Sequence, residues 1–270
     1  MTEKDILRQL AGKYGRGEAA FMVRILKEDI PGFLQNSGEV SPEGEAAFER
    51  ILSGEPVQYV TGKTKFFDLT ISVNPSVLIP RPETEEMAEK IAADIPDGFA
   101  GKIIDLGTGS GALALAMKKF FPLAEVMGSD ISPGALSTAR ENSLQNKLEV
   151  SWILLDMTNE PLPGKEIVFD LIVSNPPYIL TSEAEELPPM VKDHEPHLAL
   201  FVPGNDPLHF YKAIARFAEK NLRSGGKLWL ELHENYGKGV PGVFDSGIFG
   251  DKKIIKDISG KDRFFNCKKN

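Results

Sequence analysis

The segment Asn175-Pro176-Pro177-Tyr178 carries the most specific chemistry in the sequence. It follows an apolar run, residues 169–174, that predicts a buried parallel strand ended by the two prolines. A strand that ends in this way places a side-chain amide, a rigid backbone carbonyl and an aromatic ring around one point. Open α/β sheets bind their ligands at the carboxyl ends of their strands, so we expect a binding site here. Its groups suit the holding of a planar –NH2 group.

A glycine-rich turn forms a second candidate site. It separates a predicted strand from a predicted helix, and its residues are Gly107, Thr108, Gly109, Ser110 and Gly111. Glycine permits a tight turn and close approach of a ligand to the backbone, and the start of the following helix supplies free N–H groups. The spacing Gly-x-Gly-x-Gly differs from the Gly-x-Gly-x-x-Gly of dinucleotide-binding folds and therefore disfavours a pyrophosphate site.

Acidic residues end the next two predicted strands. Asp130 follows strand 125–129 and could accept hydrogen bonds from both hydroxyls of a ribose. Asp156 follows strand 150–155 and could accept from an adenine amino group, with Met157 packed beside the ring. Either aspartate alone is also compatible with an ordinary helix cap or turn. A glycine turn and two acids at three successive strand ends together predict a site for an adenosine-bearing cofactor.

With Asn175-Pro176-Pro177-Tyr178 added, this set resembles the S-adenosylmethionine-dependent methyltransferases that modify amino groups on planar systems. These include adenine and cytosine N-methyltransferases of nucleic acids and glutamine N5-methyltransferases of proteins. The segment Val77-Leu78-Ile79-Pro80-Arg81-Pro82-Glu83-Thr84-Glu85 is similar to the signature of the release factor glutamine methyltransferases. Residues 195–200 and 255–263 extend the similarity, so the resemblance covers nearly the whole chain.

The resemblance implies S-adenosylmethionine as cofactor, S-adenosylhomocysteine as product, and the glutamine of the Gly-Gly-Gln loop in class 1 peptide chain release factors as substrate. We expect the Asn175 side-chain oxygen and the Pro176 carbonyl to accept the two N–H groups of that glutamine, with Tyr178 packed on its flat face. The expected catalytic residues are Asn175, Pro176 and Tyr178. The expected substrate-binding residues are Asn175, Pro176, Pro177 and Tyr178. The expected cofactor-binding residues are Gly107, Thr108, Gly109, Ser110, Gly111, Asp130, Asp156, Met157 and Asn175.

The elements that must position these residues alternate between helix and strand from about residue 84. Helices are predicted over 84–93, 112–120, 133–145 and 207–222. Strands are predicted over 102–106, 125–129, 150–155, 169–174 and 227–232, with a final pair around 254–255 and 264–265. Such alternation predicts an α/β fold with a doubly wound, mostly parallel sheet. The resemblance adds that the sheet is of the class I methyltransferase, Rossmann-like type.

The chain ahead of this sheet has a different pattern. Apolar residues recur at helical spacing through the first sixty residues, and Ser41-Pro42 is a typical helix start. Residues 66–73 are rich in strand formers and predict a hairpin. We therefore divide the chain into an N-terminal helical bundle (1–62) that recognises the substrate protein, a hairpin and linker (63–83), and a methyltransferase domain (84–270).

Some residues and segments depart from these patterns or allow two interpretations. Residues 236–242 contain four helix breakers and predict a short or irregular element. Arg81 and Glu83 either order the loop between the two domains or form a linker salt bridge and a helix cap. His194 and His197 bracket a proline that disrupts the helical face on which metal ligands would stand, so we expect no metal.

Composition limits the partners of the protein. The 270 residues carry a net charge of −8, which disfavours a broad nucleic-acid surface, so we expect no stable nucleic-acid partner. A single cysteine, Cys267, fits a reducing compartment. Because the N-terminus lacks a signal-peptide pattern and no apolar run is long enough to cross a bilayer, we expect a cytoplasmic protein with no membrane association. We also expect a monomer.

Three alternative functions share part of these patterns. A nucleic-acid adenine or cytosine N-methyltransferase uses the same Asn-Pro-Pro-Tyr chemistry but usually carries a basic target-recognition region. A non-catalytic binding module that has kept cofactor affinity is a second alternative, which the intact Asn175 disfavours. A nicotinamide dehydrogenase is the third, and the sequence supplies no paired tyrosine and lysine for hydride transfer.

Overall fold

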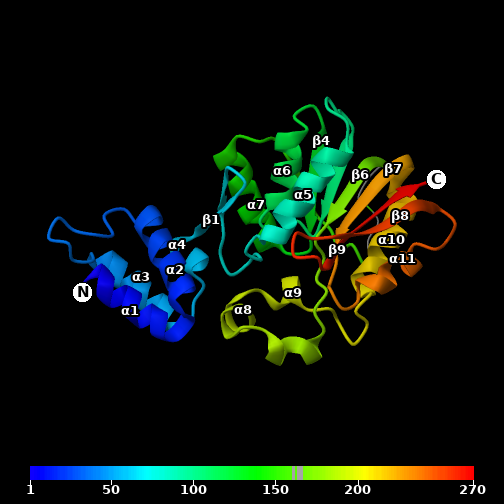
Figure 1. Ribbon diagram of the computed structural model, residues 1–270. Helices are drawn as coiled ribbons and strands as arrows, with labels where there is room; N and C mark the ends of the chain where they lie inside the picture. Colours follow the sequence, from blue (N-terminus) through cyan, green and yellow to red (C-terminus); the bar gives the residue numbers. More distant parts are fainter. Residues whose placement is uncertain (160–161, 163–166) are drawn as a thin grey trace.

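The computed structural model describes residues 1–159, 162 and 167–270. Figure 1 shows a helical bundle at the N-terminal end, a small hairpin beside it and a large sheet with helices on both faces. No helix in these described ranges is long and apolar enough to cross a membrane.

The large sheet has seven strands in the order β5-β4-β3-β6-β7-β9-β8. The first five of these are parallel, and β9 runs antiparallel to both β7 and β8. The strands are β3 (Lys102–Leu106), β4 (Glu125–Asp130), β5 (Ser151–Leu154), β6 (Phe169–Ser174), β7 (Leu222–Glu231), β8 (Phe249–Lys256) and β9 (Asp262–Lys269). This arrangement confirms the predicted doubly wound, mostly parallel sheet.

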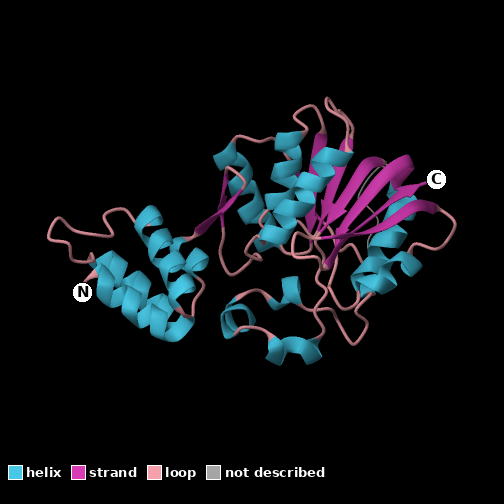
Figure 2. Ribbon diagram, viewed as in Figure 1, coloured by secondary structure: helices cyan, strands magenta, loops and turns pink. Residues whose placement is uncertain are grey.

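Helices cover both faces of the sheet (Figures 1 and 2). One face carries α5 (Pro82–Asp94), α6 (Ala112–Phe120) and α7 (Pro133–Asn146), and the other carries α10 (His209–Asn221) and α11 (Val240–Val243). Side chains alternate between the two faces with the two-residue period of a strand. In β6, for example, Leu171 and Val173 pack with α5 and α6, whereas Ile172 packs with α10. Each face therefore has its own core, and the strand ends remain free to hold a site.

The N-terminal bundle has a separate core. Its helices are α1 (Glu3–Tyr14), α2 (Arg16–Asp29), α3 (Pro42–Ser53) and α4 (Val57–Thr61). As predicted, Ser41 caps α3, because its hydroxyl accepts from the Gly44 N–H at 3.1 Å and proline follows as the first helical residue. Ile6, Leu26 and Phe48 lie fully buried in this core, which explains the helical spacing of apolar residues in the sequence.

The hairpin of β1 (Lys63–Phe66) and β2 (Leu69–Ser72) is attached to the sheet domain through α7. Asn142 of α7 accepts from the Ser72 N–H at 2.7 Å and donates to the Ser72 carbonyl at 3.0 Å, and Asn146 does the same with Thr70. The two asparagine amides thus pair with the edge strand as another strand would. Asn142 also donates to the carbonyl of Ser110 in the glycine-rich turn, so the hairpin and the turn share one anchor.

The chain between β6 and α10 contains short helices that the sequence analysis did not predict. They are η1 (Thr181–Glu186), α8 (Pro189–His194) and α9 (His197–Leu200). Ile179 bridges back to Phe201, so the segment forms a closed loop below the sheet in Figure 1. Residues 237–243 form two short helical turns, η2 (Gly237–Gly239) and α11, in agreement with the irregular element expected there.

Several predicted boundaries differ from those of the structure, and the differences at α5 and β7 have clear physical reasons. Helix α5 begins at Pro82 rather than at residue 84, because a proline is favourable at the first helical position, where no N–H partner is needed. Strand β7 begins at Leu222, five residues before the predicted start and inside the predicted helix 207–222, because residues 222–226 run beside the first residues of β6, where Phe169 pairs with Leu222. The Gly225 and Gly226 pair obscured this extension in the sequence.

Candidate active site

The glycine-rich turn and Asn175 meet where the strand order reverses. From β3 the chain proceeds outward through β4 and β5, and then returns to place β6 on the other side of β3. Such a reversal leaves a crevice at the carboxyl ends of the two central strands. Asp105 pairs with Val173, and the Ser174 hydroxyl donates to the Leu106 carbonyl at 2.6 Å. The turn after β3 and the Asn175 segment after β6 are therefore neighbours.

The glycine-rich turn needs glycine at three positions. Gly107, Gly109 and Gly111 have φ of 72°, 54° and 81°, a region that residues with a side chain rarely adopt. A Cβ atom on Gly109 would meet no described atom within 4 Å, which leaves room for a ligand against this part of the backbone. At Gly111 a Cβ atom would lie 2.7 Å from the Trp152 ring, so this glycine serves the packing between β5 and α6.

The two hydroxyl side chains of the turn point into the protein. The Thr108 hydroxyl donates to the Asp105 carboxylate at 2.6 Å, and the Ser110 side chain is buried. Any contact of Thr108 and Ser110 with a ligand would therefore come from their backbone. Asp105 is 1% exposed, and this burial raises the pKa of its carboxyl group to about 7. The sequence analysis did not assign a role to this aspartate.

Asp130 lies at the end of β4, directly beside the turn. Its carboxylate accepts from the Gly109 N–H and from the Ser132 N–H, both at 2.9 Å. Burial raises the pKa of Asp130, against the opposing effect of these backbone donors. A carboxylate offers about four acceptor positions, so two remain for the hydroxyl groups of a ribose. The residues present therefore fit the sugar of a nucleoside.

Asp156 and Met157 follow β5 and differ in their contacts. The Asp156 carboxylate accepts from the Thr158 N–H at 2.8 Å and the Thr158 hydroxyl at 2.6 Å, which is the ordinary pattern of a turn aspartate. Met157 reaches the glycine-rich turn, since its methyl group would lie 3.1 Å from a Cβ atom on Gly107. Of the two, Met157 has the better position to border a ring bound at the turn.

The Asn175-Pro176-Pro177-Tyr178 segment presents two free acceptors. Within the described part of the chain, neither the Asn175 side-chain oxygen nor the Pro176 carbonyl accepts a hydrogen bond. The nitrogen of the Asn175 amide is engaged, because it donates to the Thr84 hydroxyl at 3.1 Å. Proline at 176 and 177 restricts the backbone that carries the carbonyl. Two adjacent unpaired acceptors are suited to a group with two N–H donors.

Tyr178 is held by its hydroxyl group and by its ring. The hydroxyl donates to the Glu231 carboxylate at 3.1 Å, and the ring packs edge-on against His233 with 5.5 Å between centroids. Burial, with the adjacent Glu231, raises the pKa of Tyr178 well above its usual value, so the phenol stays protonated. Tyr178 also lines the cavity described below.

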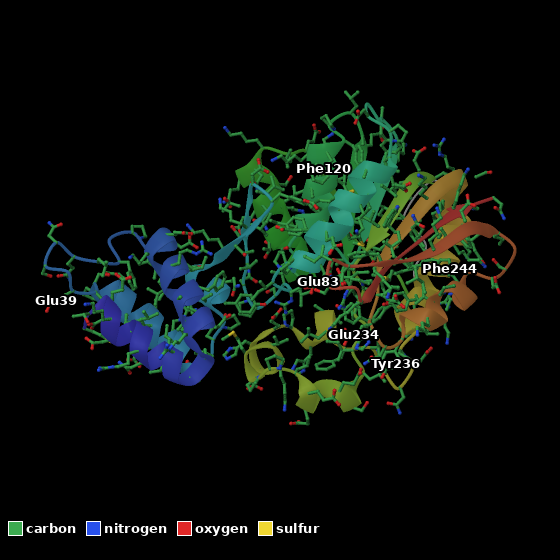
Figure 3. All side chains as sticks on the ribbon, viewed as in Figure 1. Glu39, Glu83, Phe120, Glu234, Tyr236 and Phe244 are labelled. Carbon is green, nitrogen blue, oxygen red and sulfur yellow. The ribbon has the colours of Figure 1, made fainter. Side chains whose placement is uncertain are left out.

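Thr84 and Glu231 belong to the site and were missed by the sequence analysis. Thr84, in the first turn of α5, donates its hydroxyl proton to Glu231 at 2.7 Å across 147 residues of sequence. Glu231 ends β7, is 1% exposed, and has its pKa raised to about 7 by burial. Glu83 and Glu234 are the labelled residues of Figure 3 that lie nearest in sequence to Thr84 and Glu231. The figure shows both at the same end of the sheet. A glutamate among Leu228, Leu230 and Leu232 was the available signal.

A cavity of about 260 Å³ opens beside Asn175. It is lined by the Asn175-Pro176-Pro177-Tyr178 segment, by Leu78 and Arg81 ahead of α5, and by apolar residues of the loop between β6 and α10. Arg81 is fixed here by an ion pair with the buried Glu195 at 2.5 Å, which also accepts from the Ile79 N–H at 3.2 Å. Arg81 thus forms a salt bridge that orders the chain ahead of α5, whereas Glu83 lies in the first turn of that helix.

Comparison with known proteins reveals close sequence relatives. A protein of Bacteroides thetaiotaomicron named "Release factor glutamine methyltransferase" is 41% identical over 219 residues, which cover 81% of this chain and 77% of the relative. Proteins of the same name from Thermodesulfovibrio yellowstonii (35% identical) and Streptococcus pneumoniae (38%) match over 97% of this chain and over 96% and 93% of their own lengths. The family model for the "Methyltransferase small domain" matches residues 83–194.

Solved structures share the fold at much lower identity. A methyltransferase from Pyrococcus furiosus, 21% identical, covers 82% of this chain and 97% of its own, with a TM-score of 0.56. The catalytic domain of hMettl16, in complex with an RNA hairpin, is 16% identical, covers 91% of this chain and 90% of its own, and has a TM-score of 0.58. Both are class I methyltransferase folds, which confirms the predicted sheet type.

Proposed function

The chain belongs to the release factor glutamine methyltransferases, and on that premise we propose that it transfers a methyl group from S-adenosylmethionine to N5 of the glutamine in the Gly-Gly-Gln loop of class 1 peptide chain release factors. The single observation that carries the proposal is the pair of acceptors at Asn175 and Pro176, which no described residue satisfies and which lie beside a cavity.

The cofactor site proposed here consists of the glycine-rich turn, Asp130 and Met157. The open space at Gly109 admits the ligand to the backbone, Asp130 accepts from the ribose, and Met157 borders the base. Asp156 is a weaker candidate for the adenine amino group, because its carboxylate is already engaged with its own turn. S-adenosylmethionine, when bound, supplies an electrophilic methyl group on a sulfonium, so the protein needs no metal and no activated leaving group of its own.

The residues at the end of β6 would orient the substrate amide. A carboxamide nitrogen is a poor nucleophile because its lone pair is delocalised into the carbonyl. If Asn175 and Pro176 each accept one of its N–H groups, the nitrogen is held in one orientation with its lone pair out of their plane. Orientation of reacting groups can lower a barrier by about 7–11 kcal/mol in favourable systems. A strong base is unnecessary, since the nitrogen loses its proton more easily after methylation.

The same acceptors would select glutamine over glutamate. A glutamate carboxylate offers no donor to Asn175 and Pro176 and would leave both oxygens unpaired in a partly buried cavity. Sites built to bond a donor reject an analogue that lacks it by factors of about 10⁴ to 10⁵. This discrimination supports an amide substrate, and it requires the Asn175 oxygen to face the cavity.

A second cavity, of about 550 Å³, supports the proposed role of the N-terminal bundle in partner recognition. It is bordered by Phe21 and Arg24 of α2, by Lys65 and Phe67 of the hairpin, and by residues 79–81 ahead of α5. The last of these segments also leads to the first cavity. A protein that rests on α2 and the hairpin could therefore extend a loop to Asn175. We expect the enzyme to work as a monomer in the cytoplasm, where release factors act.

The test is methyl transfer to a defined substrate. The purified protein is incubated with methyl-labelled S-adenosylmethionine and a class 1 release factor, made either with its loop glutamine or with asparagine in its place, and the label is located by peptide mass spectrometry. We expect label on the loop glutamine and none on the asparagine form. Label in neither protein, together with label in added DNA or RNA, would overturn the proposal in favour of a nucleic-acid N-methyltransferase.

A further inference from the structure

We propose that Thr84 and Glu231 are positioning residues that determine which end of the Asn175 amide faces the substrate cavity. This role rests on the proposed function, because it concerns the acceptor that holds the glutamine. Neither residue borders the cavity. Thr84 acts through Asn175, and Glu231 acts through Thr84 while it also holds the Tyr178 hydroxyl. Together they form a linear chain of hydrogen bonds from a buried carboxylate to the side chain that would touch the substrate.

The three groups of this chain come from three different elements. Asn175 follows β6, Thr84 lies in α5, and Glu231 ends β7, the strand next to β6. The Asn175 amide nitrogen lies 3.1 Å from the Thr84 hydroxyl oxygen, which lies 2.7 Å from one Glu231 oxygen. Thr84 is 7% exposed and Glu231 is 1% exposed, so no bulk water competes for these bonds. The geometry couples the end of one strand to the start of a helix and the end of another strand.

The direction of each bond follows from counting protons. An ionised glutamate can only accept, and a threonine hydroxyl has one proton to donate. Above about pH 7, where Glu231 is ionised, Thr84 must therefore give its proton to Glu231, and its oxygen is left with lone pairs toward Asn175. Only the –NH2 end of the amide can satisfy a lone pair, so the Asn175 oxygen is directed away from Thr84, toward the cavity. In the reversed amide, two oxygens would face each other at 3.1 Å.

Glu231 is itself fixed at both oxygens. Its second oxygen accepts from the Tyr178 hydroxyl at 3.1 Å, and its backbone carbonyl accepts from the Tyr211 hydroxyl at 3.2 Å. Tyr178 belongs to the same segment as Asn175, so Glu231 holds both ends of that segment, one directly and one through Thr84. The carboxylate cannot rotate to release Thr84 without also releasing Tyr178.

The test compares two substitutions of Thr84. Thr84→Val keeps the shape but removes the hydroxyl, whereas Thr84→Ser keeps the hydroxyl. For each variant, kcat and KM for the release factor are measured at saturating S-adenosylmethionine. Thermal unfolding is measured separately to show that the variant is folded. We expect Thr84→Val to lower kcat by about 10- to 100-fold, the range seen when a group that orients a binding side chain is removed, with KM within about threefold. Thr84→Ser should recover kcat to within about threefold of the wild type.

Glu231→Gln provides a second measurement if Thr84→Val unfolds. The glutamine amide can face Thr84 with its oxygen or its nitrogen, and only the first arrangement preserves the direction of the bonds. We expect Glu231→Gln to lower kcat severalfold without raising KM. In the double variant Thr84→Val/Glu231→Gln, the loss of kcat should be smaller than the product of the two single losses, because Glu231 acts on Asn175 through Thr84. Any further loss relative to Thr84→Val alone reports the separate contact of Glu231 with Tyr178.

The outcomes separate the two proposals. Equal kcat in the wild type, Thr84→Ser and Thr84→Val would overturn the positioning role and leave the proposed function intact. Independent, multiplicative losses in the double variant would also overturn it. No transfer by the wild-type protein would overturn the proposed function, and the positioning role with it.

Discussion

At the scale of single residues, the site combines unpaired acceptors with buried acids. Asn175 and Pro176 offer oxygens that no described residue satisfies, while Asp105 and Glu231 are carboxyl groups at 1% exposure. Burial raises the pKa of both acids to about 7. An ionised Glu231 is the form that gives the Asn175 amide a single direction, so the most useful form of this residue is also the more costly one to bury.

This cost predicts a pH dependence of stability. In the unfolded chain Glu231 has an ordinary pKa near 4.5, and in the folded protein its pKa is about 7. Between these values the folded state holds a proton that the unfolded state has lost, so the free energy of unfolding falls as pH rises from about 4.5 to 7. The groups that face this carboxyl are Thr84, Tyr178, Arg263 and Glu83.

Glu231→Gln removes the titrating group, so it should also remove the part of the decrease in the free energy of unfolding that Glu231 causes. Relative to the wild type, the variant should gain on the order of 3 kcal/mol in the free energy of unfolding between pH 4.5 and pH 8. Urea unfolding at several pH values measures the difference, and Asp105, present in both proteins, cancels. A difference that does not change with pH would show that Glu231 titrates normally.

Site residues differed in how far the sequence alone could identify them. Asn175, Asp130 and the glycines follow predicted strands, and parallel strands bring their carboxyl ends to one edge, so a local pattern was enough to group them. The partners Thr84 and Glu231 lie 147 residues apart, on a helix and a strand whose contact only the tertiary fold decides. Asp156 shows the converse, because its turn contacts look the same with or without a ligand.

At the scale of elements, one ion pair joins the chain ahead of α5 to the loop between β6 and α10. Glu195 is 3% exposed and accepts from both Arg81 and the Ile79 N–H. The Arg81 side chain is 31% exposed, so it retains contact with water while it neutralises a buried acid. These contacts hold two walls of the cavity beside Asn175 against each other.

Removal of one partner should leave a buried charge without compensation. We expect Arg81→Leu to lower the free energy of unfolding by about 2–3 kcal/mol, less than for a fully buried pair because Arg81 is partly exposed. The double variant Arg81→Leu/Glu195→Gln should recover part of this loss, since the glutamine can still accept from the Ile79 N–H. The control Arg140→Leu, at an exposed position of α7, should change the free energy of unfolding by less than about 0.5 kcal/mol. Urea unfolding at pH 7 compares the four proteins, and equal effects of Arg81→Leu and Arg140→Leu would contradict the account.

The elements of the sheet were largely predictable, and those of the cavity wall were not. Strands β3 and β6 and helix α6 have the predicted bounds, because their apolar periodicity is strong and their ends carry glycine or proline. Helices α8 and α9 have only 6 and 4 residues and follow Pro188 and Pro196. Such short helices depend on contacts such as the bridge from Ile179 to Phe201, and no periodicity in the sequence reveals them.

At the scale of the whole molecule, the bundle and the sheet domain have separate cores but share the border of the larger cavity. Phe21 on α2 is 37% exposed, although its side chain is large and apolar. The central carbon of the Arg24 guanidinium lies 5.4 Å from the centroid of the Phe21 ring. An exposed aromatic residue beside an arginine is typical of the centre of a protein interface. Partner recognition by the bundle, as proposed, predicts that this pair contacts the release factor away from the reacting glutamine.

Phe21→Ala should therefore weaken recognition without affecting chemistry. We expect KM for the intact release factor to rise about tenfold, with kcat within about twofold. Transfer to a short peptide that contains only the Gly-Gly-Gln loop should not change. Glu18→Gln, at an exposed position of the same helix that does not border the cavity, serves as the matched control. Equal KM values for Phe21→Ala and Glu18→Gln would contradict a role of Phe21 in recognition.

The most direct test of the account is the single-turnover rate of Asn175→Ala with saturating S-adenosylmethionine and release factor. Loss of one of the two acceptors should slow methyl transfer by about 10²- to 10³-fold, a magnitude typical of removing one oriented polar contact at a reacting group. The dissociation constant of the release factor should stay within about threefold, because most of its contacts lie elsewhere. A rate within tenfold of the wild type would contradict the claim that Asn175 holds the glutamine amide for transfer.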